Sequence, residues 1–152
     1  LILVWLRDID GQGRQVVIWL FAIIWATDIG AYFSGKSIGG PKLAPTISPN
    51  KTWAGFFGGL FFAGLMGFIL NSYVEASFDM LEISIASVAL SIVGQLGDLL
   101  ESWVKRTFEV KDSGSLIPGH GGVLDRIDAI LLAIPVAGII VLIYDIGEVP
   151  WK

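Results

Sequence analysis

The fold is decided by one stretch of the sequence, AGFFGGLFFAGLMGFILNSY at residues 54–73, which carries no charged side chain. About 20 mostly apolar residues allow an α-helix to cross roughly 30 Å of hydrocarbon, so this stretch predicts a membrane span. Small residues recur at every fourth position, at Gly55, Gly59, Ala63 and Gly67. They share one helix face and permit close approach of a neighbouring backbone. We interpret this face as a packing surface, whose partner is either another helix of the chain or a second copy in a homodimer.

Three further stretches, at residues 16–33, 83–104 and 129–146, are long and apolar enough to cross a bilayer. Hydrophobic residues make up 54% of the chain and charged residues 16%, against about 25% charged in soluble domains. We therefore predict an all-α, polytopic transmembrane bundle with about four complete spans, forming a single domain over residues 1–152. The apolar run at residues 1–6 is too short to span, and we expect it to be the end of a cut helix in the C-terminal part of a longer chain.

Charge and cysteine content exclude several classes of function. The formal net charge of −4 argues against a nucleic-acid partner, because binding to a phosphate backbone needs an excess of Lys and Arg. The chain has no cysteine, which excludes disulfides and thiolate metal sites.

Basic residues gather in two segments, residues 34–53 and 105–128, which are separated by two of the expected spans. The two segments together hold seven of the ten Lys and Arg residues: Lys36, Lys42, Lys51, Lys105, Arg106, Lys111 and Arg126. Loops rich in Lys and Arg stay on the cytoplasmic side of a membrane. We therefore expect both segments to be cytoplasmic.

Five carboxylates lie in or beside the apolar spans, near the expected cytoplasmic boundary: Asp28, Asp98, Glu101, Asp125 and Asp128. A carboxylate at membrane depth is costly unless a cation, a basic side chain or water compensates it. For Asp98, Asp125 and Asp128 we favour a divalent cation such as Mg²⁺, which takes carboxylate oxygens and keeps water or phosphate as its other ligands. The alternative is an ion-paired helix interface, with Lys105, Arg106 or Arg126 as partners. We favour that structural role for Glu101, and Asp28 stays open between the two.

The two basic segments also carry phosphate-binding chemistry. SGKSIGGPKLAPTISPNKT at residues 34–52 combines glycines with Lys, Ser and Thr, although it lacks the order of a Walker motif. In residues 105–128, basic side chains, a glycine turn and a carboxylate pair follow in close order, which suits a metal-bound triphosphate. His120 either shapes the PGHGG turn or contacts substrate. We assign it no role as a general base, because a phosphate nucleophile is already ionised.

Residues 102–128 resemble the signature of the phosphatidate cytidylyltransferase (CDP-diacylglycerol synthase) family. The matching runs are SWVKR at 102–106, KDSG at 111–114 and IPGHGGVLDRID at 117–128. DIGAY at 28–32, GK at 35–36, ISPNKT at 47–52 and GQLGDLLE at 94–101 also resemble that family. The chain departs from it at Ala54, where the family usually has Glu, and this puts any contact from that position in doubt.

The resemblance implies a nucleotidyltransferase of phospholipid biosynthesis in the bacterial inner (plasma) membrane, with its active site facing the cytoplasm. CTP and phosphatidic acid would give CDP-diacylglycerol and pyrophosphate, with Mg²⁺ as cofactor and one cation or two. We predict that the metal is held by Asp98, Asp125 and Asp128, with Asp28 as a further candidate. Lys51 and Arg126 are predicted to act with these acids in catalysis. The predicted substrate-binding residues are Lys36, Ser48, Lys51, Lys105, Arg106, Lys111 and His120.

Two other functions stay open on the sequence. A CTP-dependent polyprenol or phytol kinase would have similar electrostatics but would transfer the γ-phosphoryl group. An ion-coupled transporter also uses intramembrane acids and glycine-interrupted helices. The clustering of the acids at one boundary, rather than at the midplane, opposes the transporter.

Overall fold

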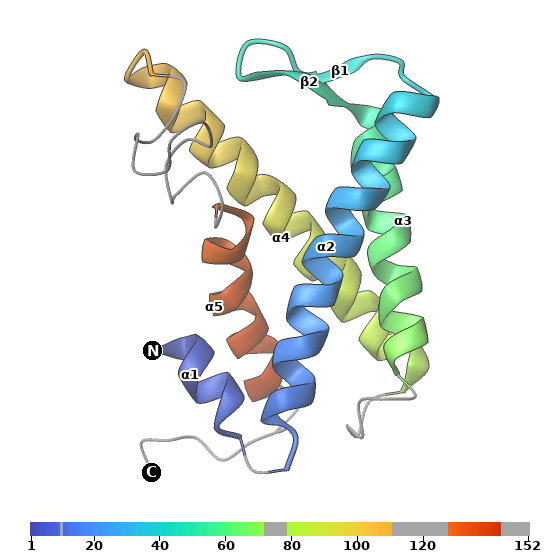
Figure 1. The fold of residues 1–152 in the computed structure, drawn as a ribbon, viewed down its shortest axis with the longest axis vertical. Coiled ribbons are helices and arrows are strands. Elements are labelled where there is room, and N and C mark those ends of the chain that lie inside the picture. The colour runs from blue at the N-terminus through green and yellow to red at the C-terminus, as the bar shows by residue number, and fades with distance from the viewer. Residues whose placement is uncertain (10, 72–78, 111–127, 144–152) are drawn as a thin grey trace, which may run out of the picture.

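A computed structural model gives the arrangement of the chain and describes residues 1–9, 11–71, 79–110 and 128–143. The described residues form five helices and one β-hairpin, arranged as in Figure 1. In chain order they are α1 (Ile2–Arg7), α2 (Gly13–Ser37), β1 (Lys42–Ala44), β2 (Ser48–Thr52), α3 (Trp53–Leu70), α4 (Met80–Thr107) and α5 (Asp128–Ile143).

Three helices, α2, α3 and α4, are long and apolar enough to cross a membrane, which confirms three of the expected spans. The fourth expected span, at 129–146, corresponds to α5, which is apolar but has 16 residues within the described chain. A count of four therefore stays a prediction. At 28 residues α4 is about 42 Å long, which exceeds the hydrocarbon thickness, so its ends reach the polar layers. A capping box of Asp79 and Glu82 begins it.

The expectation of a purely α-helical fold was wrong in one detail, because a short antiparallel hairpin joins α2 to α3. Lys42 pairs with Thr52 and Ala44 with Ser48, with a tight turn closed by the Ile47 N–H donating to the Ala44 carbonyl at 3.2 Å. No apolar alternation marks these strands, so they could not be predicted from the hydropathy pattern. The hairpin lies at the same end of the molecule as the C-terminal end of α4 (Figure 1). The described parts of the two basic segments thus meet at one end, as predicted.

The small-residue face of α3 packs inside the chain. Gly55, Gly59, Ala63 and Gly67 are all buried. A Cβ added at Gly55 would lie 2.9 Å from the Ala31 carbonyl oxygen of α2, and one added at Gly67 would overlap the Ser87 side chain of α4. The face is therefore a packing surface, and its partners are α2 and α4. A homodimer through other surfaces stays a prediction.

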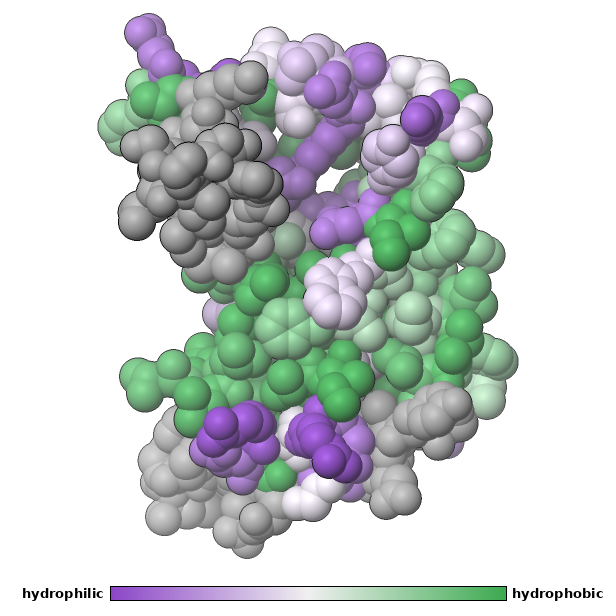
Figure 2. Space-filling view, in the orientation of Figure 1, coloured by the Kyte–Doolittle hydropathy of each residue, from purple (hydrophilic) through white to green (hydrophobic). Residues whose placement is uncertain are grey.

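Between its two polar ends the molecule carries a broad apolar belt (Figure 2). Most of the large side chains of α3 that point away from the packing face are exposed, among them Phe57, Phe61 and Phe68. Side chains of this kind would face lipid in a spanning helix. At the end that carries the hairpin, the polar surface is hollowed (Figure 2).

Candidate functional site

A cavity of about 490 Å³ lies beneath the hairpin, between the C-terminal half of α2, the start of α3 and α4. Residues spaced by three or four on α2 give it one wall, because such residues share a helix face. These are Asp28, Ala31, Tyr32, Gly35 and Lys36. The cavity is thus built where apolar helices reach the polar end of the molecule.

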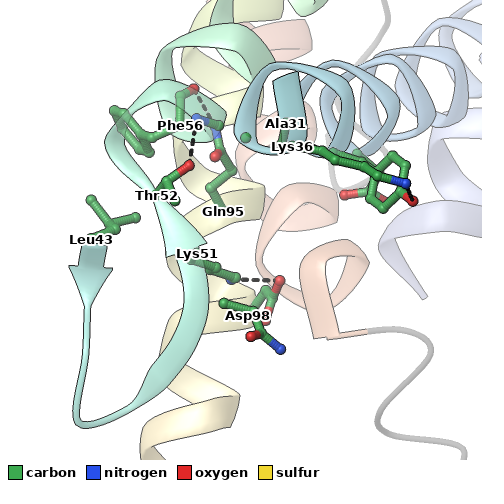
Figure 3. A pocket seen from close by; sticks show the side chains of 13 residues that line it. Ala31, Lys36, Leu43, Lys51, Thr52, Phe56, Gln95 and Asp98 are labelled. Carbon is green, nitrogen blue, oxygen red and sulfur yellow. Dashed lines mark hydrogen bonds and ion pairs between the residues drawn. The ribbon is translucent and has the colours of Figure 1, made fainter. Parts of the chain in front are cut away.

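An ion pair between Lys51 and Asp98 crosses the cavity (Figure 3). Lys51 Nζ lies 2.6 Å from Asp98 Oδ2, and the two side chains are 27% and 38% exposed. Asp98 Oδ1 accepts a weak hydrogen bond of 3.4 Å from Ser102 Oγ, one turn further along α4. The sequence predicted that an ion-paired Asp98 would take its partner from the basic residues near the end of α4 or the start of α5. The partner comes instead from β2.

The second lysine of the cavity, Lys36, is held by Tyr32, one turn earlier on α2. Lys36 Nζ donates a hydrogen bond of 3.2 Å to the Tyr32 hydroxyl oxygen and lies 5.4 Å from the centre of the ring. In Figure 3 the Lys36 side chain points away from the Lys51–Asp98 pair. The two lysines therefore bring two separate positive charges to one cavity.

Polar side chains from two further elements also line the cavity. Asn50 and Thr52 come from β2 and Gln95 from α4. Thr52 is also the N-cap of α3, because its Oγ1 accepts a hydrogen bond of 3.1 Å from the Gly55 N–H. A cap of this kind satisfies a free amide at the helix start and fixes the angle between strand and helix. It thereby fixes where Lys51, the preceding residue, stands.

Three predicted substrate-binding residues in the described chain lie outside the cavity lining. Lys105 Nζ pairs with Glu101 Oε2 at 2.9 Å, which confirms the structural role expected for Glu101. Arg106 Nε donates a hydrogen bond of 3.4 Å to the Ile47 carbonyl oxygen and so ties the end of α4 to the hairpin turn. Ser48 begins β2 and is half-buried. Substrate contacts from these three residues stay predictions.

Other predicted site residues lie outside the described residues: Lys111, His120, Asp125 and Arg126. Asp128 begins α5, but its side chain is likewise not described. The neighbouring Ala129 lies against Gly94, since a Cβ added at Gly94 would be 3.8 Å from the Ala129 Cβ. Gly94 precedes Asp98 by about one helical turn, or about 6 Å along the axis. The start of α5 therefore lies close to the depth of Asp98.

The described donors match part of a magnesium site. Asp28 and Asp98 offer carboxylate oxygens to one cavity, and Mg²⁺ is often bound by one or two carboxylates together with substrate phosphates. Within residues 1–9, 11–71, 79–110 and 128–143 no group of three or more His, Cys, Asp or Glu could hold a metal ion. The two carboxylates are part of the donor set that Mg²⁺ takes, with phosphate and water as its other usual ligands.

Sequence reasoning missed the neutral members of the cavity: Tyr32, Asn50, Thr52 and Gln95. A signal for two of them was present. Tyr32 lies four residues after Asp28, and Gln95 three residues before Asp98, so each shares a helix face with a candidate acid. Asn50 and Thr52 carried no such signal, because the hairpin that places them was not predicted.

Comparison with known proteins gives one family. Residues 1–144 match the sequence model of the Cytidylyltransferase family. Proteins named phosphatidate cytidylyltransferase are similar to the chain in several bacteria. That of Brucella suis is 52% identical over 128 residues, 84% of this chain and 47% of the relative. The protein of that name from Bacillus subtilis is 45% identical over 130 residues, which are 86% of this chain and 48% of the relative. The protein of that name from Staphylococcus saprophyticus is 41% identical over 138 residues, which are 91% of this chain and 53% of the relative. The chain thus spans about half the length of the curated relatives it matches.

Proposed function

Because the chain belongs to the cytidylyltransferase family, we propose that the protein transfers the cytidylyl group of CTP to phosphatidate. The products are CDP-diacylglycerol and pyrophosphate. The relatives named phosphatidate cytidylyltransferase support this choice of substrates.

One structural observation carries the proposal: Lys36, Lys51 and Asp98 line a single cavity at the polar end of apolar helices. A phosphatidate molecule keeps its acyl chains in the hydrocarbon and its phosphate at the headgroup plane. CTP reaches the same plane from water. A charged cavity at the end of the spans is where the two phosphates can meet, whereas a site at the midplane would exclude the nucleotide.

In the proposed reaction, an ionised phosphate oxygen of phosphatidate forms a bond to the α-phosphorus of CTP. The bond from that phosphorus to the bridging oxygen of the β-phosphate breaks, and pyrophosphate leaves with the electron pair. No proton has to be removed from the nucleophile. Catalysis then rests on positioning two anions in line and on neutralising the charge that develops.

Lys51 and Lys36 supply that neutralisation from the described part of the chain. Lys51 Nζ is buried, and among the described residues its ion-pair partner is Asp98. Its other N–H groups have no acceptor among those residues, and they are proposed to bond phosphate oxygens when substrate enters the cavity. Lys105, Arg106, Lys111, His120 and Arg126 are proposed to contact the substrates from the segment after α4, and Ser48 from the hairpin.

Mg²⁺ is proposed as the cofactor, held by Asp98 with Asp125, Asp128 and Asp28, and a second cation is the alternative to a single one. When bound, the cation would withdraw charge from the CTP phosphates. The two basic segments are proposed to face the cytoplasm from the inner membrane, because Lys-rich and Arg-rich segments stay on that side.

The test is CTP-dependent release of pyrophosphate in membranes that contain the complete protein and added phosphatidic acid. Asp98→Asn and Asp125→Asn should each lower the rate at least 100-fold. Asp8→Asn is the matched control, because Asp8 is exposed and pairs with Arg7 at the end of α1. Release of CDP and a newly phosphorylated lipid would instead identify a kinase. Full activity in both active-site variants would remove the role proposed for the acids.

A further inference from the structure

Gln95, on the cavity face of α4, is held by hydrogen bonds through one end of its amide. Its Nε2 donates to the Phe56 carbonyl oxygen of α3 at 3.3 Å and to Ser91 Oγ at 3.4 Å. Figure 3 shows the side chain between Phe56 and the Lys51–Asp98 pair. An amide has only two N–H donors, so both are used within the protein.

The groups that hold Gln95 are themselves fixed. Ser91 Oγ is hydrogen-bonded to Thr27 Oγ1 of α2 at 2.9 Å, and both residues are buried. Gly59 leaves room for the amide, since a Cβ there would lie 3.1 Å from Gln95 Nε2. Three helices thus set the orientation of one side-chain amide. Buried and connected polar groups of this kind hold a unique geometry.

The carbonyl end of the same amide remains for a ligand. Gln95 lines the cavity, and no described residue donates a hydrogen bond to its Oε1. We propose that Gln95 Oε1 accepts a hydrogen bond from the nucleoside part of CTP and so contributes to the choice of nucleotide. This inference rests on the function proposed above.

Chemistry points to the nucleoside rather than to the lipid. As a hydrogen-bond acceptor a carbonyl oxygen needs an N–H or O–H donor, whereas ionised phosphates offer acceptors alone. Phosphatidate has no hydroxyl or amine outside its phosphate. CTP has the exocyclic amine of cytosine and the hydroxyls of ribose. A binding site built around such a group rejects analogues that lack it, because its own polar atom is then left unpaired.

The experiment measures kcat/KM for pyrophosphate release with CTP, UTP, 2′-deoxy-CTP and 3′-deoxy-CTP, using the complete protein in membranes. In Gln95→Met, which keeps the length of the side chain but loses the acceptor, the preference for CTP over one analogue should fall about tenfold. A change against UTP identifies the amine as the donor, and a change against a deoxynucleotide identifies a ribose hydroxyl. Gln15→Met, at the other end of α2, is the control.

If Gln95 has only a structural role, Gln95→Met should lower the rates with all four nucleotides by the same factor. Unchanged preferences among the nucleotides would overturn this inference but leave the proposed function standing. If wild-type membranes release no pyrophosphate from CTP, the proposed function fails and the inference falls with it. Ser91→Ala, which removes one of the two bonds that hold the amide without lining the cavity, gives a second reading. Ser91→Ala should lower the preference for CTP over the same analogue as Gln95→Met does, by a smaller factor. Unchanged preferences in Ser91→Ala and in any folded Gln95 variant count against the proposal.

Discussion

Removing Lys51 should affect stability and activity in different ways, because its ammonium group both pairs with Asp98 and faces the cavity. Lys51→Met keeps most of the apolar length of the side chain and deletes the charge. Asp98 is then left without its cation in a half-buried position. The variant should be less stable, and its capacity to hold phosphate should fall.

The magnitude follows from the exposure of the pair. Exposed ion pairs contribute about 0.2–1 kcal/mol, and breaking a buried one costs about 3–5 kcal/mol. Side chains that are 27% and 38% exposed lie between these limits, so we expect Lys51→Met to cost about 1–3 kcal/mol. Asp98→Asn should cost about as much. The double variant removes both charges and should be no less stable than either single variant, which means a coupling of at least about 1–3 kcal/mol.

The assay is a double-mutant cycle of unfolding free energies in a mild detergent, together with pyrophosphate release by each variant. Lys42→Met is the matched control, since Lys42 lies exposed in the same hairpin, outside the cavity lining. Activity should fall at least 100-fold in Lys51→Met and in the double variant, although the latter regains stability. Additive losses of stability, with no coupling, would refute the pairing of Lys51 with Asp98.

Three further predictions follow from single contacts. Tyr32→Phe removes the hydroxyl that holds Lys36, so steady-state kinetics should show KM for CTP raised about two- to fivefold with kcat unchanged. An unchanged KM would mean that Lys36 does not need this hydroxyl to position it. Gly67→Ala would press on Ser87, which accepts a hydrogen bond of 2.9 Å from Trp19 Nε1, and should cost about 1–3 kcal/mol in denaturation measurements. Gly64→Ala, which meets one side-chain carbon at 3.1 Å, should cost less, and equal costs would contradict the packing described. Chelation with EDTA should abolish pyrophosphate release by the wild type, and added Mg²⁺ should restore it. Added Mg²⁺ should not restore activity in Asp98→Asn. Activity that survives chelation would exclude the proposed cofactor.

The spans and their packing face were predictable because both follow from simple physics. Twenty apolar residues have few alternatives to a spanning helix, and small residues at a spacing of four must share a face. The partner of that face was not predictable. It depends on the Ala31 carbonyl oxygen and the Ser87 side chain, and a spacing of small residues does not say which helix will meet which.

Asp98 and Lys51, the ion pair of the cavity, were each predictable as site residues, but their pairing was not. Asp98 was conspicuous as a charge in an apolar stretch, and Lys51 as a cation in a glycine-rich segment. Their contact depends on the hairpin, which is stabilised by a tight turn and by the cap at Thr52 rather than by apolar alternation. Sequence pattern therefore singled out the two charged residues, and their pairing came only from the fold.

The wall of the cavity between α2 and α3 consists partly of backbone, because Gly35 and Gly55 both line it. The two glycines lie close together, since a Cβ added at Gly35 would be 3.5 Å from the Gly55 Cα. An inhibitor that rests on this wall touches atoms that no mutation can delete. A Cβ at Gly55 would lie 2.9 Å from the Ala31 carbonyl oxygen and push α2 and α3 apart, and one at Gly35 would lie 3.1 Å from the Thr52 hydroxyl that caps α3. Resistance by reshaping this wall would therefore disturb the protein's own structure. Escape would have to arise in the rest of the lining, on the hairpin, α2 or α4, where side chains form the surface of the cavity.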